Sequence, residues 1–137
     1  MHIVQYKDRY FAEVDQLWRS EFPNDPKRNS APLAIPKKLA EEDGLFWVAL
    51  DEPGHVIGTI MAGWDGYRGW LYSVAVKPDR RLNGTGTALV NTALDALSDL
   101  GCNKVNLQIR SSNHEVVRFY ETLGFVVEPI VSMGRTL

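Results

Sequence analysis

Apolar residues recur at helical spacing near the start of the chain. Residues 3–6 alternate enough to predict a short opening strand, and Asp8 then stands where a helix would be capped. The next apolar positions follow in steps of three and four, which predicts a helix with one buried face that ends near Phe22 and Pro23. These positions are Phe11, Val14, Leu17 and Trp18. We interpret them as core residues.

Prolines interrupt the pattern between Pro23 and Pro36. This stretch is expected to be a loop, and Pro36 is expected to begin a short helix that ends at Gly44. Long loops on compact domains often carry binding functions, and a plain connector is the alternative that the sequence leaves open.

Three strands are predicted next, at residues 45–50, 56–64 and 70–76. The short polar and glycine-containing stretches 51–54 and 65–69 separate them and predict turns. Such short connections join antiparallel neighbours, so these strands should form a meander.

The C-terminal half alternates helices and strands. A helix that begins near Gly84 and is closed by Gly101 is followed by a period-two strand at residues 104–110. A strand–helix–strand unit of this kind predicts a crossover between parallel strands. A further helix from Asn113 to Gly124 and a closing pair of strands at residues 125–128 and 131–135 complete the prediction.

Composition narrows the class of protein. A chain of 137 residues, 45% hydrophobic and 23% charged, suits one domain spanning residues 1–137. A net charge of −2 and a pI near 5.9 argue against a nucleic-acid partner. The single cysteine, Cys102, has no disulfide partner and no metal-ligand spacing around it, so no metal is expected. With no signal peptide or long apolar run, we expect no membrane contact and a cytoplasmic location.

The stretch from Val74 to Val90 carries the strongest chemical signal. A β-prone run leads through Pro78 into a turn with Gly84 and Gly86, which opens a helix. Helix N-termini bind anionic oxygens because their first N–H groups have no intrahelical partner, and glycine lets a ligand approach those amides. The pattern therefore predicts a phosphate-binding turn.

Two other phosphate motifs do not fit this turn. The Walker type needs a Lys-Ser/Thr pair after its second glycine, and Thr87-Ala88 follow Gly86 instead. The dinucleotide type needs a third glycine where Leu89 stands, and too few strands follow for a doubly wound sheet.

Two motifs together resemble the GCN5-related N-acetyltransferase (GNAT) family. Arg81-x-x-Gly84-x-Gly86, after a strand that ends Val-x-Pro, is similar to its acetyl-CoA signature. Asn113, a six-residue spacer, Tyr120 and then Glu121-x-x-Gly124-Phe125 are similar to its second signature. The resemblance runs from Trp47 to Phe125 and more loosely includes the first helix.

The resemblance implies an α+β fold of three layers: a mixed, mostly antiparallel, twisted sheet of six to seven strands, a splayed parallel pair at its centre, and about four helices. The cofactor would enter the wedge between residues 74–76 and 105–109. It would be bound by the strand, the turn and one residue of the second signature. These residues are Val74, Ala75, Val76, Arg81, Leu82, Asn83, Gly84, Thr85, Gly86, Thr87 and Asn113. Leu82 and Asn83 depart from the commonest pattern, where glycine and a basic residue are frequent, which puts phosphate affinity in question.

The implied reaction is direct attack of an amine on acetyl-CoA in a ternary complex, without an acyl-enzyme. Tyr120 is the implied catalytic residue, with its hydroxyl directed at the sulfur. The amine acceptor, a small molecule or a peptide, stays open, as do the acyl-chain preference and the oligomeric state, a homodimer included. Asp65, Glu21, Glu42 or a water chain could remove the proton of the amine, and we assign none. The alternative function is a non-catalytic acyl-CoA-binding or sensing module.

Overall fold

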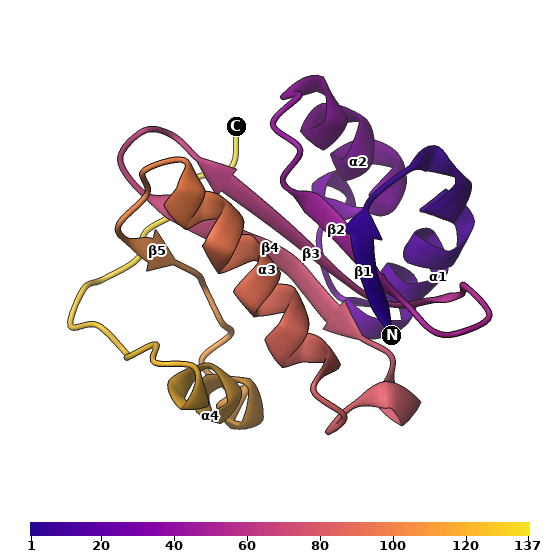
Figure 1. Cartoon of the computed structure of the whole chain (residues 1–137). Coiled ribbons are helices and arrows are strands. Elements are labelled where there is room, and N and C mark those ends of the chain that lie inside the picture. The colour runs from indigo at the N-terminus through magenta and orange to yellow at the C-terminus, as the bar shows by residue number, and fades with distance from the viewer. The chain divides into compact units, whose positions relative to one another are not determined.

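The strands of the N-terminal part form one sheet in chain order (Figure 1). The structure is a computed structural model that describes all residues 1–137, in two units: residues 1–107 and residues 108–137. The strands are β1 (His2–Gln5), β2 (Phe46–Leu50), β3 (Val56–Trp64), β4 (Gly69–Val76) and β5 (Val105–Asn106). Neighbouring strands are antiparallel except β4 and β5, which are parallel. The predicted meander and parallel crossover are therefore confirmed.

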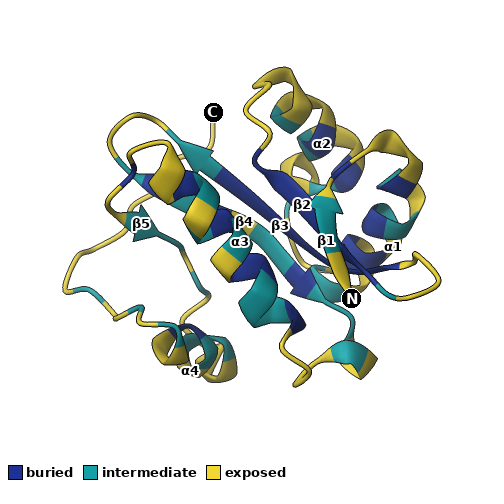
Figure 2. Ribbon diagram, in the orientation of Figure 1, coloured by how far each residue is buried: buried dark blue, intermediate teal, exposed yellow.

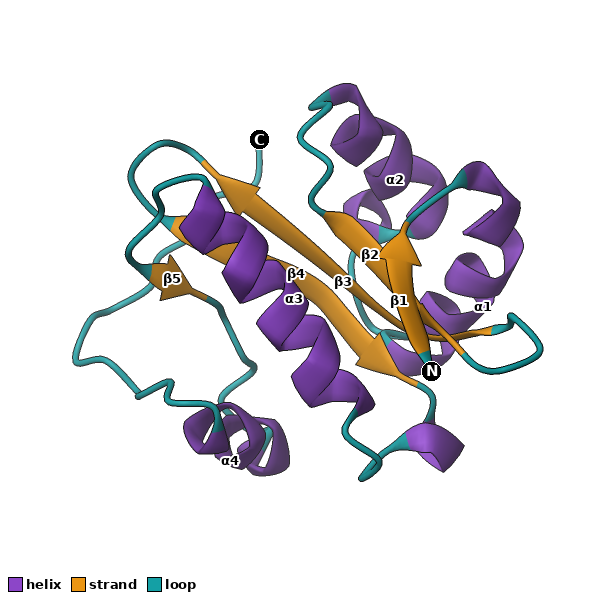
Figure 3. Cartoon of the chain, in the orientation of Figure 1, coloured by secondary structure: helices purple, strands orange, loops and turns teal.

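Four α-helices accompany the sheet, as expected (Figure 3). They are α1 (Phe11–Glu21), α2 (Ala31–Ala40), α3 (Thr85–Asp99) and α4 (His114–Thr122), and the short 3-10 turns are η1 (Asp8–Tyr10), η2 (Lys27–Asn29) and η3 (Pro78–Arg80). None of the helices is long and apolar enough to cross a membrane.

Helix α2 begins five residues earlier than the sequence predicts, at Ala31 instead of Pro36. Pro36 lies inside the helix, where it removes a single backbone donor. Ala31 and Ile35 are almost fully buried, at 1% and 2% exposure. Burial of this face outweighs the local cost of the proline, and the irregular loop shrinks to the residues around η2.

Helices cover both faces of the sheet in the first unit. A Cβ added to Gly58 would meet Leu89 of α3, whereas the next residue, Thr59, bonds to Trp18 of α1. Consecutive strand residues face opposite sides, so α1 and α3 pack on opposite faces of β3. Figure 2 shows the result, with β2 and most of β3 buried between the layers.

The sheet has five strands and not the expected six to seven. The strand predicted at residues 104–110 is reduced to β5, and residues 125–128 and 131–135 form no strands. Their apolar side chains remain exposed, and β-prone residues form a strand only where a neighbour pairs with them. These exposed residues are Val126, Val127, Val131 and Met133. The α+β class with a mixed, mostly antiparallel sheet is confirmed, but the parallel pair lies at the edge of the sheet instead of its centre.

Candidate active site

The turn between β4 and α3 has the backbone shape that the motif predicts. Gly84 is the N-cap of α3 and has φ 81° and ψ 2°, in the left-handed region that glycine adopts at little cost. Leu82 also has a positive φ, 65°, and its side chain is fully exposed. Gly86 lies within the first turn of α3 and has no positive φ. The two glycines therefore differ in conformation: Gly84 shapes the turn with its positive φ, whereas Gly86 is a residue of the helix itself.

The N-terminus of α3 is open to an anionic group. No side chain caps it, and its first turn holds no acidic residue. The amide of Ala88 donates to the carbonyl of Gly84 at 2.9 Å, so the amides of residues 85–87 come before the first intrahelical bond. Together with the helix dipole, these donors fit a pyrophosphate.

Arg81 ties this turn to two other elements. Its Nε donates to the carbonyl oxygen of Val76 at 3.2 Å, and its guanidinium forms an ion pair with Glu21 at the end of α1. The side chain of Glu21 is only 13% exposed. The carboxylate that the sequence left open as a base is thus engaged in holding the turn.

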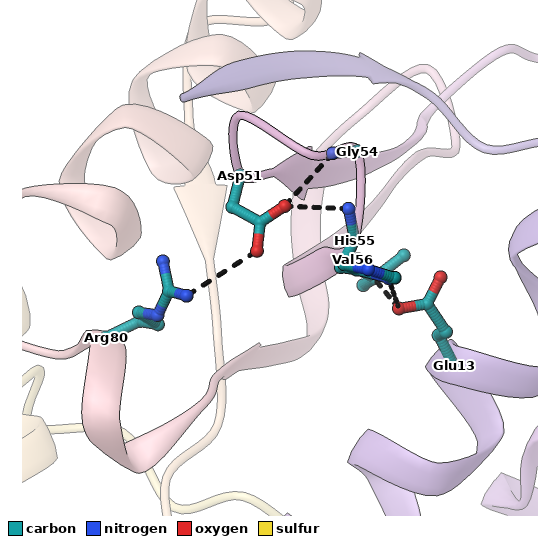
Figure 4. A network of polar contacts seen from close by, with 6 residues as sticks. All are labelled: Glu13, Asp51, Gly54, His55, Val56 and Arg80. Atoms are coloured by element: carbon teal, nitrogen blue, oxygen red, sulfur yellow. Dashed lines mark hydrogen bonds and ion pairs between the residues drawn. The ribbon is translucent and has the colours of Figure 1, made fainter.

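A second polar network, drawn in Figure 4, connects α1, the β2–β3 turn and η3. Asp51 accepts from the amides of Gly54 and His55, at 3.1 and 2.8 Å, and lies 3.5 Å from Arg80. The hydrogen bond from the backbone amide of His55 is the main reason that the pKa of Asp51 is lowered. On the other side, Glu13 accepts from the amide of Val56 at 3.1 Å. The network anchors both ends of this turn and holds Arg80 beside the turn that is predicted to bind phosphate.

Strand β4 contains a bulge between its two ends. Thr59 pairs with Ala75 and Met61 with Tyr72, so two residues, Ser73 and Val74, oppose the single residue between Thr59 and Met61. Ser73 has φ 50°, an uncommon value for a residue with a side chain. The bulge lies two residues before the end of β4, beside the strand segment expected to bind the cofactor.

The edge of β4 beyond the bulge is open on the β5 side. The parallel pairing joins only Gly69 to Val105 and Trp70 to Asn106. Lys77 donates to Ile57 of β3, and backbone groups alternate in direction along a strand, so those of Val76 and Val74 point toward the open edge. The bond from Arg81 to the carbonyl of Val76 agrees with this direction.

A buried hydrogen-bond chain fixes the peptide group at the bulge. The indole Nε1 of Trp18 donates to Oγ1 of Thr59, and this hydroxyl donates to the carbonyl oxygen of Ser73, both at 2.9 Å. In a trans peptide the C=O and the following N–H point in opposite directions. Because the Ser73 carbonyl points at the Thr59 hydroxyl, the N–H of Val74 points away from Thr59, which agrees with the alternation that directs it toward the open edge.

The remaining two expected site residues lie on α4, in the second unit. Asn113 is the N-cap, and its Oδ1 accepts from the amide of Val116 at 3.4 Å. Tyr120 is 6% exposed and makes edge contacts with the rings of Phe119 and Phe125. Burial raises the pKa of the Tyr120 phenol. Asn113 and Tyr120 are seven residues apart, about two helical turns.

Comparison with known proteins decides the family. Residues 11–125 match the model of the Acetyltransferase (GNAT) family. Over 142 aligned positions the chain is 35% identical to an acetyltransferase of Sodalis glossinidius (strain morsitans), covering 100% of this chain and 96% of that protein. This chain belongs to the GNAT family.

Solved structures show the same fold. Ard1 from Thermoplasma volcanium has a TM-score of 0.83 at 23% identity, over 93% of this chain and 83% of its own. A chain of the NatC complex bound to Gag peptide and CoA has a TM-score of 0.78 at 24% identity, over 92% of this chain and 86% of its own. The chain is an N-acetyltransferase of the GNAT fold.

The acidic groups considered as the base of this acetyltransferase are not equivalent. Asp65 accepts from the amides of Arg68 and Tyr67, both at 2.8 Å, and these bonds lower its pKa. A carboxylate stabilised in this way is a poor proton acceptor. Glu42 has φ 53° and is exposed in the turn after α2, and Glu21 is paired with Arg81.

Sequence reasoning missed the bulge of the acetyltransferase and the chain of hydrogen bonds behind it. A glycine or asparagine in β4 would have signalled a positive φ, but serine is an ordinary strand residue. Trp18 was correctly expected in the core, where it is 3% exposed. Its indole N–H has a polar partner that no periodicity in the sequence could have identified.

Proposed function

We propose that this N-acetyltransferase transfers an acetyl group from acetyl-CoA to a primary amine by direct attack in a ternary complex. The observation that carries the proposal is the open edge of β4, which runs from the bulge at Ser73 and Val74 into the uncapped N-terminus of α3. An extended ligand with amide groups and a terminal pyrophosphate is complementary to such a path.

The donor would bind along this path. The backbone groups of Val74 and Val76, on either side of Ala75, would pair with the pantetheine arm as another strand would. The amides from Leu82 to Thr87, which include those of Asn83, Gly84, Thr85 and Gly86, would bind the pyrophosphate. Arg81 would hold this turn in shape. Asn113 uses Oδ1 to cap α4, so its side-chain NH₂ would make the contact with the donor.

The chemistry needs few side chains because a thioester is already activated. The nitrogen of the amine attacks the carbonyl carbon, the C–S bond breaks, and the sulfur takes a proton from the hydroxyl of Tyr120. The N–H of Val74 would donate to the carbonyl oxygen as negative charge develops there. A phenol is protonated at neutral pH, as a general acid requires, and burial raises the pKa of Tyr120 further.

Both units would contribute to one catalytic domain spanning residues 1–137. The family match at residues 11–125 continues from the first unit into the second, which supports this proposal.

The acceptor would be a small-molecule or peptide amine. The NatC structure contains a Gag peptide together with CoA. A site between residues 23–36 and the turn at residues 65–69 would have to reach from one end of β4 to the other. Glu21, next to the first segment, pairs with Arg81 after the carboxyl end of β4, whereas the 65–69 turn precedes its amino end. We therefore place the acceptor at the open edge beside Val74.

The deciding test combines binding with turnover. Thermal shift with CoA, acetyl-CoA and longer acyl-CoAs should show stabilisation by acetyl-CoA, and release of free thiol across a panel of primary amines and peptides should identify the acceptor class. Binding without thiol release for any amine would favour the sensing module. No stabilisation by any CoA species would contradict the donor site.

A further inference from the structure

We propose that Trp18 and Thr59 are positioning residues for acetyl transfer, because they orient the N–H of Val74 toward the thioester carbonyl. The inference rests on the proposed function and adds two residues that lie outside the donor-binding turn and both signatures.

The direction of the hydrogen-bond chain is fixed by chemistry. An indole N–H can only donate, so Oγ1 of Thr59 must accept from Trp18. The single hydroxyl proton of Thr59 is then committed to the carbonyl of Ser73, which can only accept. The hydrogen-bond chain therefore has one stable arrangement of donors and acceptors.

Burial makes this arrangement costly to break. Thr59 is 0% exposed and Trp18 is 3% exposed, so no water competes for either group. The indole also packs against the ring of Phe46, with centroids 6.0 Å apart, and Phe46 stacks on Tyr6 at 4.4 Å. A buried polar atom left without a partner loses its hydrogen bonds to water without replacement, which destabilises the fold. The aromatic rings thus support the hydrogen-bond chain, and burial makes the loss of either hydrogen bond unfavourable.

The hydrogen-bond chain ends on the Ser73–Val74 peptide, which lies next to a strained residue. Ser73 has φ 50°, and a residue with a side chain does not keep this conformation unless its surroundings enforce it. Without the Thr59 hydroxyl, the Ser73–Val74 peptide could rotate and turn the N–H of Val74 away from the open edge. The strained bulge and the Thr59 hydroxyl that supports it together orient a single hydrogen-bond donor, the N–H of Val74.

The central test is Thr59→Val, which removes the hydroxyl and keeps the shape of the side chain. We expect the affinity for CoA to stay within about twofold, while kcat falls roughly tenfold or more because a misdirected donor stabilises the developing charge less. Thr59→Ser should recover most of kcat. Thr92→Val is the matched control: the Thr92 hydroxyl bonds only to Ala88 within α3, and kcat should be unchanged.

A spectroscopic measurement separates positioning from general loss of stability. The carbonyl stretch of bound [1-¹³C]acetyl-CoA should shift to lower frequency in the wild-type protein and in Thr59→Ser, and the shift should shrink in Thr59→Val. If Thr59→Val does not fold, Trp18→Phe is tested with the same measurements. If both variants fold, the double variant should be no slower than the more affected single variant.

Each outcome decides one of the two proposals. Folded Thr59→Val with wild-type kcat, or with a lower kcat but an unchanged carbonyl shift, would overturn the positioning role and leave the acetyltransferase reaction standing. A wild-type protein that binds acetyl-CoA but releases no thiol with any amine would instead overturn the proposed function, and the carbonyl shift would still test the role of Thr59.

Discussion

The guanidinium of Arg81 pairs with the carboxylate of Glu21, so the first residue of the donor signature is joined to the last residue of α1. The same guanidinium donates to the carbonyl of Val76. Arg81 therefore connects the end of β4, the proposed phosphate-binding turn and the helix that carries Trp18. We infer that its main role is to hold the turn and that its effect on phosphate is indirect.

A double-mutant cycle tests this role of Arg81. Glu21→Gln and Arg81→Gln should each weaken CoA binding several-fold, and the double variant should be no worse than either. The free energy of unfolding should change by less than about 1 kcal/mol, because Arg81 is 53% exposed and solvent screens the pair. Asp15→Asn, which removes the partner of Arg19 on the same helix, should leave CoA affinity unchanged. Fully additive losses would show that Arg81 contacts the donor independently of Glu21.

Leu82 occupies a position that suits glycine. Its φ of 65° is in the left-handed region, and its side chain is exposed, so little packing offsets the strain. We expect Leu82→Gly to raise the free energy of unfolding by up to about 1 kcal/mol, which is the strain relieved minus the extra chain entropy of glycine. CoA should bind at least as tightly. Chemical denaturation and calorimetry check both expectations, and a clear loss of stability would contradict them.

The two glycines of the turn should respond differently to substitution. Gly84→Ala should cost about 1 kcal/mol of stability, because an added Cβ meets no atom within 4 Å and only the positive φ of 81° opposes it. Gly86→Val places a side chain at the first turn of α3, where valine is no worse a helix residue than glycine. It should leave the melting temperature unchanged and weaken CoA binding roughly tenfold or more, about 1.4 kcal/mol. Unchanged CoA affinity in a folded Gly86→Val protein would rule out the proposed pyrophosphate site.

Tyr120→Phe separates catalysis from binding. Removing only the oxygen preserves the ring contacts with Phe119 and Phe125, so fold and CoA affinity should survive. Loss of the general acid should lower the single-turnover rate roughly a hundredfold. Since the pKa of this phenol is raised, the wild-type rate should show no decline from its ionisation between pH 6 and pH 9. A wild-type single-turnover rate in Tyr120→Phe would reduce this residue to a packing role.

The ionisation of Tyr6 should make the stability of the fold depend on pH in the alkaline range. Burial, with the nearby charge of Asp8, raises the pKa of Tyr6 to about 12 in the folded protein, against about 10 in an unfolded chain. The neutral phenol therefore stabilises the fold fully below pH 10, and this contribution is lost as the pH rises toward 12. Melting temperatures between pH 9 and pH 12 should fall more steeply for the wild-type protein than for Tyr6→Phe. Equal slopes would indicate that lysine titration alone explains the decline.

The sequence by itself determined the elements whose pattern is local. The period of Val14, Leu17 and Trp18 defines the buried face of α1, and Gly84 marks the positive φ at the start of α3. The two signatures indicated the family because their glycines, Asn113 and Tyr120 stand at fixed spacings. Each of these features depends on residues within one or two helical turns.

Only the tertiary structure decided which distant residues act together. The hydrogen bond from Trp18 to Thr59 spans 41 residues of chain, and the Arg81–Glu21 pair spans 60. Trp18, Thr59 and Glu21 have no local signal for these bonds, and the signature that contains Arg81 does not indicate its partner. Pro36 sits within α2 because Ala31 and Ile35 are buried there, and residues 125–135 form no strand despite their composition. Packing and pairing with remote segments settle such cases, since they contribute more free energy than local propensity does.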